Sequence, residues 1–318
     1  MSLHRGPLAV DVAGLVFQNP IVLAAGTAAY GRELAGVVDL GALGGIVTKA
    51  VSPEPRAGAR SPRVAEFDGG MINAVGLANP GVAAVRSDHL PWLAASLPRT
   101  RKLANIVGFT TEEFAAVIAE LDASLSADSA GSLDGYEINV SCPNVKAGGM
   151  EFGAEHASLT DVVRRARAAT RRPIFVKLSP MLPDIARTAA VAVDAGADAI
   201  SVVNTIPGLV IDVGRRRPAL GFGSGGVSGT ALRPVGVLAT WKIRRALSVP
   251  IMGIGGVATA DDALQYLIAG ASLVGMGTAM LRDPRAPERV VRGLAQWCAQ
   301  AGVARIADIV GSLEVPSP

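Results

Sequence analysis

Short apolar runs recur along the chain, and most are followed by an alanine-rich segment with the period of an amphipathic helix. Runs rich in β-branched residues and bounded by glycine or proline are typical of buried parallel strands. The pattern predicts eight strands, over residues 19–26, 45–50, 103–108, 135–142, 173–179, 199–205, 250–256 and 273–278.

The segments between these runs predict helices, the first of which opens Thr-Thr-Glu-Glu in the manner of a capped start. Eight strands alternating with helices predict a closed (β/α)8 TIM barrel, as a single domain over residues 1–318. A doubly wound sheet is the alternative, but no early strand-linked Gly-x-Gly-x-x-Gly is present. The helices are expected over residues 111–125, 159–170, 184–195, 234–247, 261–269 and 287–299.

Two long glycine-rich stretches interrupt the simple repeat. Residues 52–81 carry alternating apolar positions, which predict a β-hairpin and loop laid over the carboxyl-terminal mouth of the barrel. Residues 206–233 are also expected to rise above the strand ends. Loops of this length in a compact domain are usually functional.

The stretch from Gly135 to Asn144 stands out within this pattern. Apolar and polar residues alternate through its first half, as in a strand, and Pro143 is expected to end that strand. Cys142 would therefore lie at or just beyond a carboxyl strand end. The tail, which includes Gly148 and Gly149, is interpreted as a movable loop.

Composition narrows the class of protein. Hydrophobic residues make up 50% of the chain and charged residues 18%, which favours a large core. The formal net charge of +3 is too small to indicate a nucleic-acid partner. We expect a cytoplasmic protein that does not enter the membrane, because no apolar run reaches spanning length and no signal peptide is evident. Two cysteines cannot supply a four-ligand cluster, and no metal site is expected.

Polar residues recur at the predicted carboxyl strand ends, where barrel active sites are assembled. Taken singly, such asparagines and threonines cap turns, and such lysines reach solvent. Their recurrence on several strands favours a shared site. The residues are Lys49, Asn105, Asn139, Lys177, Asn204 and Thr205, with Asn73 on the covering loop.

Glycines at the ends of the last two predicted strands, Gly255-Gly256 and Gly275-Met-Gly-Thr278, give a different signal. Bare backbone there would let N–H groups approach a phosphate, although tight turns alone would also explain it. Two buried lysines, several amides and a phosphate grip suit flavin mononucleotide (FMN). Pyridoxal phosphate is the alternative, but the amides fit an imide-like substrate better.

Cys142 is a candidate general base, because a thiolate could remove the proton of an acidic C–H group. Lys146, with Lys49 or Lys177, would lower the pKa of its thiol. Most free cysteines are instead small buried hydrophobes. We assign that role to Cys298, which lies on a helical pattern.

Several motifs together resemble the dihydroorotate dehydrogenase family over about residues 8–281. The most specific is Asn139-Val-Ser-Cys-Pro-Asn-Val-Lys-x-Gly-Gly149. The cysteine resembles class 1, since membrane-associated class 2 enzymes use serine and carry an N-terminal extension. The tail of the motif resembles class 1B, the NAD⁺-linked form. Other matching motifs are Pro62-Arg-Val-Ala-Glu66, Asn73-Ala-Val-Gly-Leu-x-Asn-Pro-Gly81, Val176-Lys-Leu-Ser-Pro180, Asn204-Thr205, Gly225-Gly-Val-Ser-Gly229 and Gly253-Ile-Gly-Gly256.

The resemblance implies oxidation of dihydroorotate to orotate in pyrimidine biosynthesis, with Cys142 removing the C5 proton and C6 giving hydride to FMN. It also implies two sets of binding residues. Those expected to contact the substrate are Lys49, Asn73, Ala74, Val75, Gly76, Leu77, Asn139, Asn204 and Thr205. Those expected to contact FMN are Ala25, Lys49, Ala50, Asn105, Asn139, Lys177, Val203, Gly229, Gly255, Gly256, Gly277 and Thr278.

Class 1B further implies a partner subunit that carries FAD and a 2Fe–2S cluster, in a heterotetramer built on a homodimeric core. The nearest alternatives are a homodimeric fumarate-reducing class 1A enzyme and a related FMN-dependent pyrimidine oxidoreductase. A non-catalytic ligand-binding barrel ranks below them. The chain departs from the family at Ala25, where a serine is common, and in the segment from Thr27 to Tyr30.

Overall fold

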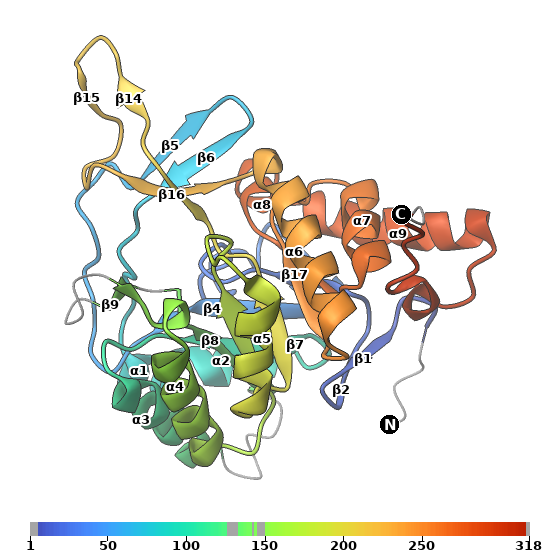
Figure 1. Ribbon diagram of the computed structural model, residues 1–318, viewed down its shortest axis with the longest axis horizontal. Helices are drawn as coiled ribbons and strands as arrows, with labels where there is room; N and C mark the ends of the chain where they lie inside the picture. The colour runs from blue at the N-terminus through green and yellow to red at the C-terminus, as the bar shows by residue number, and fades with distance from the viewer. Residues whose placement is uncertain (1–5, 126–132, 142, 145–149, 316–318) are drawn as a thin grey trace.

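The computed structural model describes residues 6–125, 133–141, 143–144 and 150–315. Eight parallel strands close into a barrel, which confirms the predicted TIM-barrel class (Figure 1). Every predicted apolar run overlaps one of these strands. In chain order they are β3 (Ile21–Leu23), β4 (Gly45–Val51), β7 (Arg101–Ile106), β8 (Gly135–Asn139), β11 (Ile174–Leu178), β12 (Ala199–Val202), β17 (Ile251–Ile254) and β18 (Leu273–Met276).

Helices follow the barrel strands and pack their apolar faces against the outside of the barrel (Figure 1). In α3, for example, Phe114, Ile118 and Leu121 are fully buried. The side chains of Thr110, Asp184 and Thr259 cap three of the helices by accepting backbone N–H groups. The six helices that match predicted segments are α3 (Thr111–Ala123), α4 (His156–Ala169), α5 (Ile185–Asp194), α6 (Arg233–Ala246), α7 (Ala260–Ala269) and α9 (Ala286–Ala301).

The helical region after β6 (Gly70–Asn73) was not predicted. It contains α1 (Val82–Ala84), a π-helical turn η2 (Val85–His89) and α2 (Leu90–Ser96). The π turn adds a residue per turn and shifts the apolar positions out of the 3.6-residue period. Shorter elements are α8 (Thr278–Arg282), η1 (Leu40–Ala42), η5 (Phe152–Ala154), η6 (Thr230–Leu232), η7 (Ile306–Ile309) and the hairpin β1 (Val10–Val12) and β2 (Leu15–Phe17). Across the described part of the chain, no helix has the length and apolar character needed to cross a bilayer.

Both glycine-rich insertions contribute to one antiparallel sheet of four strands, ordered β13-β16-β6-β5. The predicted hairpin in the first insertion is present, and its second strand pairs with β16 of the second insertion, with Asn73 opposite Gly226. The β14–β15 segment projects away from the body of the molecule (Figure 1). The strands concerned are β5 (Val64–Phe67), β6 (Gly70–Asn73), β13 (Ile206–Gly208), β14 (Ile211–Asp212), β15 (Arg217–Pro218) and β16 (Gly225–Ser228).

The fourth barrel strand is shorter than predicted, because β8 ends at Asn139 rather than at residue 142. Pro143 begins β9 (Pro143–Asn144), which pairs with β10 (Met150–Glu151) outside the barrel. The apolar–polar alternation of β8 does not mark a strand with one face exposed to solvent, because every residue of β8 is buried. Tyr136 and Glu137 are both fully buried, the first against α3 and the second inside the barrel.

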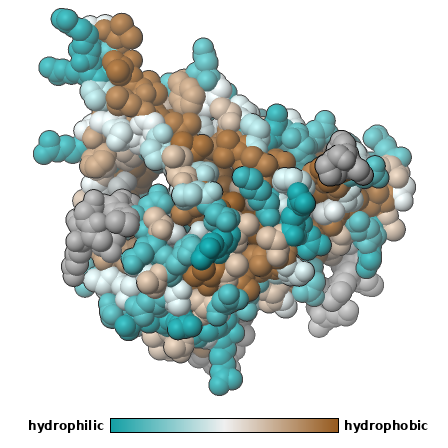
Figure 2. Space-filling model, viewed as in Figure 1, coloured by the Kyte–Doolittle hydropathy of each residue, from teal (hydrophilic) through white to brown (hydrophobic). Residues whose placement is uncertain are grey.

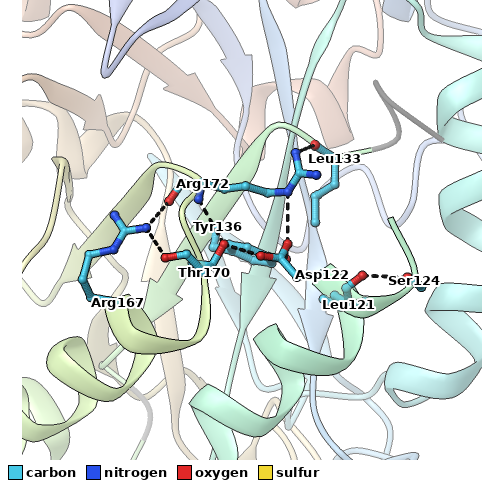
Figure 3. A network of polar contacts seen from close by, with 8 residues as sticks. All are labelled: Leu121, Asp122, Ser124, Leu133, Tyr136, Arg167, Thr170 and Arg172. Atoms are coloured by element: carbon cyan, nitrogen blue, oxygen red, sulfur yellow. Dashed lines mark hydrogen bonds and ion pairs between the residues drawn. The ribbon is translucent and has the colours of Figure 1, made fainter. Parts of the chain in front are cut away.

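A polar network joins α3 to β8 and to the start of β11 (Figure 3). The Asp122 carboxylate accepts hydrogen bonds from the Tyr136 hydroxyl, the Thr170 hydroxyl and the Arg172 guanidinium. Arg172 also donates to the Leu133 carbonyl at 2.7 Å. Burial, with the hydrogen bond to Asp122, raises the pKa of Tyr136 above its usual range. Asp122 therefore satisfies a fully buried hydroxyl on the strand that leads to the barrel mouth.

Replacing Asp122 by alanine should lower the free energy of unfolding by about 1–3 kcal/mol, because the buried Tyr136 hydroxyl loses its acceptor. Denaturant titration would measure this loss. Asp161→Ala is the control, since Asp161 pairs with Arg165 on the exposed face of α4 and should leave the midpoint unchanged. Equal midpoints for the two variants would contradict the structural role of Asp122.

Candidate functional site

A cavity of about 880 Å³ opens at the carboxyl end of the barrel. Residues at or just after the ends of all eight barrel strands line it, and the four-stranded sheet contributes Met71, Asn73 and Ser228. Parallel strands bring all their carboxyl ends to one rim, so residues far apart in the sequence meet here. The cavity therefore lies where the sequence pattern predicted a site.

The lining brings together nearly all the residues predicted to bind substrate or FMN, although their roles stay predictions. Ala74 and Gly76 are not in the lining: the Ala74 N–H donates to the Arg63 carbonyl, and Gly76 is exposed. Cys142 lies outside the described residues, as do Lys146, Gly148 and Gly149. The residues brought together are Ala25, Lys49, Ala50, Asn73, Val75, Leu77, Asn105, Asn139, Lys177, Val203, Asn204, Thr205, Gly229, Gly255, Gly256, Gly277 and Thr278.

Lys177 and Asn105 form a polar floor, and a third residue that was not predicted, Glu137, lies behind them and contacts both. Lys177 is 6% exposed, and its Nζ lies 3.7 Å from Glu137 Oε1. Asn105 Nδ2 donates to the same oxygen at 2.8 Å. The signal in the sequence was a glutamate two residues before Asn139, which places both side chains on the same face of the strand. A charged residue there requires a buried partner.

Lys49 differs from the expectation of two buried lysines, because it is only half-buried. Its backbone N–H donates to the Ala29 carbonyl, and Tyr30 donates its hydroxyl to the Ala50 carbonyl at 2.9 Å. The Tyr30 ring in turn stacks on His89, with centroids 4.1 Å apart. The segment from Thr27 to Tyr30, which departs from the family pattern, therefore holds the end of β4. The sequence did not predict this role.

Amide side chains in the cavity are held in fixed orientations. Asn204 Nδ2 donates to Asn139 Oδ1 at 3.3 Å, while Asn204 Oδ1 accepts the Thr205 N–H at 2.8 Å. Asn73 Nδ2 donates to the Gly226 carbonyl at 3.1 Å across the β6–β16 pair. Oriented amides of this kind can read the donors and acceptors of a planar polar ring.

The ends of β17 and β18 provide bare backbone beside hydroxyl groups. Gly255 and Gly256 have φ values of +131° and +68°, which residues with a Cβ rarely adopt. A Cβ on Gly256 would lie 2.8 Å from the Arg233 backbone nitrogen. The Thr278 hydroxyl lies 2.8 Å from that of Ser228. Backbone and hydroxyl donors are the groups that proteins present to phosphate.

Several lining residues were not predicted, including Ser228, Thr230 and Thr27. Thr27 is of interest because Ala25 lacks the hydroxyl common in the family. The Thr27 hydroxyl lines the same corner and donates to the Ala24 carbonyl at 2.6 Å. A hydroxyl therefore remains at this corner, two residues further along the chain.

The set of donors fits a flat heteroaromatic group with a phosphate tail, as FMN has. The cavity combines two ammonium groups, four amide side chains and a glycine-rich end with hydroxyls. Among the residues placed in the structure, no group of three or more His, Cys, Asp or Glu side chains is arranged to hold a metal ion. The ammonium, amide and hydroxyl groups of the lining suit an organic cofactor and a planar substrate.

Comparisons with known proteins agree with this geometry. The dihydroorotate dehydrogenase family matches residues 7–297. "Dihydroorotate dehydrogenase B (NAD(+)), catalytic subunit" of Pelobacter propionicus is 43% identical over 96% of this chain and 98% of its own length. The protein of the same name from Desulforudis audaxviator is 45% identical, over 96% of each chain.

Two further similarities concern the alternatives and the fold. A "putative dihydroorotate dehydrogenase A (fumarate)" of Solibacter usitatus is 45% identical over 96% of this chain and 98% of its own length. The crystal structure of DHODH from Eimeria tenella in complex with ferulenol superposes with a TM-score of 0.81. At 24% identity, over 98% of this chain and 90% of that one, it shows the shared fold. By the family match and these relatives, the chain belongs to the dihydroorotate dehydrogenase family.

Proposed function

We propose that this protein is the catalytic subunit of an NAD⁺-linked dihydroorotate dehydrogenase and oxidises dihydroorotate to orotate with FMN. The observation that carries the proposal is the single cavity in which a buried lysine, oriented amides and a glycine-rich end meet. The names of the relatives from Pelobacter propionicus and Desulforudis audaxviator support the NAD⁺-linked class.

In this proposal the floor and the glycine-rich end of the cavity hold FMN. Lys177 and Asn105 would contact the ring from the floor, while Gly256 and Thr278 would hold the phosphate. Bound FMN would supply the acceptor for hydride, and an ammonium group close to its ring would stabilise the negative charge of the reduced form. The other proposed FMN contacts are Ala25, Lys49, Ala50, Asn139, Val203, Gly229, Gly255 and Gly277.

The substrate would bind beside FMN, between the strand ends and the covering sheet. The amides of Asn73, Asn139 and Asn204 would bind its ring and carboxylate, with Lys49 and Thr205 beside them. Val75 and Leu77 line this part of the cavity, whereas Ala74 and Gly76 would contribute through the backbone they support. Cys142 is proposed as the base that removes the C5 proton, on the strength of the Asn139–Asn144 motif.

Electrons would leave through a partner subunit that carries FAD and a 2Fe–2S cluster, in the cytoplasm. The chain has two cysteines, too few for such a cluster. A homodimeric core is supported by exposed apolar residues on the β14–β15 projection, including Ile211 and Val213 (Figure 2). Two catalytic chains with two partners would form the proposed heterotetramer.

Purified protein should be yellow with one FMN per chain, and Gly256→Ala should weaken FMN binding at least tenfold. The added methyl group collides with the Arg233 backbone and strains a positive φ at the proposed phosphate contact. Fluorescence titration of the apoprotein would measure the affinity. Gly302→Ala is a matched control, because its φ is +67° and nothing lies within 4 Å of the new Cβ. A wild-type apoprotein that cannot take up FMN would refute the flavin assignment.

Cys142→Ala should leave FMN bound but slow its reduction by dihydroorotate about 10²-fold or more, since general-base catalysis contributes that much. Stopped-flow absorbance of the flavin would follow the reaction. Cys142→Ser should keep partial activity, and Cys298→Ala, in the core, should reduce flavin at the wild-type rate. Near-normal reduction by Cys142→Ala would exclude this thiol as the base.

The electron acceptor can be determined from the protein that co-purifies. Affinity purification from the native cell should recover a subunit that contains FAD and a 2Fe–2S cluster, and the complex should reduce NAD⁺ with dihydroorotate. A homodimer that reduces fumarate without a partner would instead support the class of the Solibacter usitatus relative.

A further inference from the structure

Glu137 is the most deeply buried charged residue associated with the cavity, yet it does not line the cavity. It occupies the middle of β8, is fully inaccessible to solvent and faces the barrel interior. Burying a carboxylate costs several kcal/mol unless partners compensate it. A glutamate at this depth therefore requires a reason beyond filling space, which an apolar side chain would do at lower cost.

Its contacts connect it to two proposed FMN residues from below. Glu137 Oε1 accepts from Asn105 Nδ2 at 2.8 Å and lies 3.7 Å from the Lys177 ammonium. Both partners line the cavity. Any effect of Glu137 on a bound ring would therefore pass through these side chains and through the electric field of its charge.

The second carboxylate oxygen adds an independent observation. Glu137 Oε2 is buried and has no hydrogen-bond partner within the described part of the chain, and the same is true of the Ser201 hydroxyl. Ser201 is the register neighbour of Lys177 on the adjacent strand. The charge of Glu137 is thus compensated by one ammonium and one amide. In a low-dielectric interior such a charge acts strongly on its surroundings.

We propose that Glu137 is a positioning residue that fixes Lys177 at the proposed FMN site and offsets part of its positive charge, which lowers the reduction potential of FMN. The inference rests on the proposed function, since it requires FMN in contact with Lys177. An unopposed ammonium would stabilise the anionic reduced ring most strongly. Because the Glu137 carboxylate lies 3.7 Å from the Lys177 ammonium, the net positive charge at the site is smaller and the reduced form of bound FMN would be less stabilised.

The test is the reduction potential of bound FMN in Glu137→Gln, measured by spectroelectrochemical titration of the purified holoprotein. Glutamine keeps the shape and the oxygen that accepts from Asn105, but it removes the charge. The reduction equilibrium should shift at least tenfold toward reduced flavin, about 30 mV for a two-electron couple. A potential that is unchanged or lower would overturn the inference.

Asp134→Asn is the matched control, because Asp134 is also a largely buried carboxylate in an ion pair, with Arg101 at 2.7 Å, just before β8 begins. It should reduce thermal stability without moving the potential. In a Lys177→Gln background, adding Glu137→Gln should shift the equilibrium less than it does in the wild-type background, because only the direct field of the carboxylate remains and there is no ammonium left to position. An undiminished shift there would overturn the role of Lys177 as the intermediary.

If Glu137→Gln does not fold, Glu137→Asp provides the same test, since it withdraws the carboxylate from Lys177 by one methylene. Its potential should rise by a smaller amount, at least twofold in the equilibrium, and an unchanged value would overturn the inference. A wild-type protein that takes up no FMN would refute the proposed function and this inference together. FMN-loaded variants with wild-type potentials would refute this inference alone.

Discussion

The whole site depends on the closure of the barrel between β18 and β3. Val274, Gly275 and Met276 pair with Ile21, Val22 and Leu23, so the last strand binds the first. This pairing turns a row of strands into a ring and gives their carboxyl ends a common rim. A strand end would otherwise lie at an open edge, far from the end it faces across the cavity. Closure is what brings Ala25 and Gly277 into the same cavity as Lys177.

Once the ring is closed, the place of a charged side chain in the barrel wall decides which groups it can contact. Lys102 and Lys177 are both nearly inaccessible to solvent. Lys102 donates to the Leu97 carbonyl, close to α2 on the outside of the barrel, and its burial lowers the pKa of its ammonium. Lys177 faces the cavity and has a carboxylate partner. Two lysines of similar burial thus differ in whether a ligand can reach them, because they lie on opposite faces of the barrel wall and at opposite ends of their strands.

The sequence predicted the barrel because each of its strands is a compact apolar run. Such a run can be recognised as a buried strand from its own residues, without knowledge of its neighbours in space. It predicted most of the cavity lining for a related reason, since polar residues that follow apolar strands must converge at the rim. Glu137 was missed because the interior-facing and the helix-facing positions of a parallel strand are both buried. The alternation along the strand therefore does not show which positions face the barrel interior. The early end of β8 was missed because the pairing of Pro143 with a segment beyond it depends on tertiary contacts.

The joining of the two insertions could not be predicted either, because nothing local in β6 or β16 specifies the other. Their pairing has a consequence for how such proteins diverge. β4 and β12, which precede the two insertions, are four strands apart in a ring of eight, so the β6–β16 pair spans the diameter of the mouth. The two loops are consequently one structural unit. A chimera that exchanged one of them between relatives would have to exchange both, or it would leave half a sheet with an unpaired edge over the cavity.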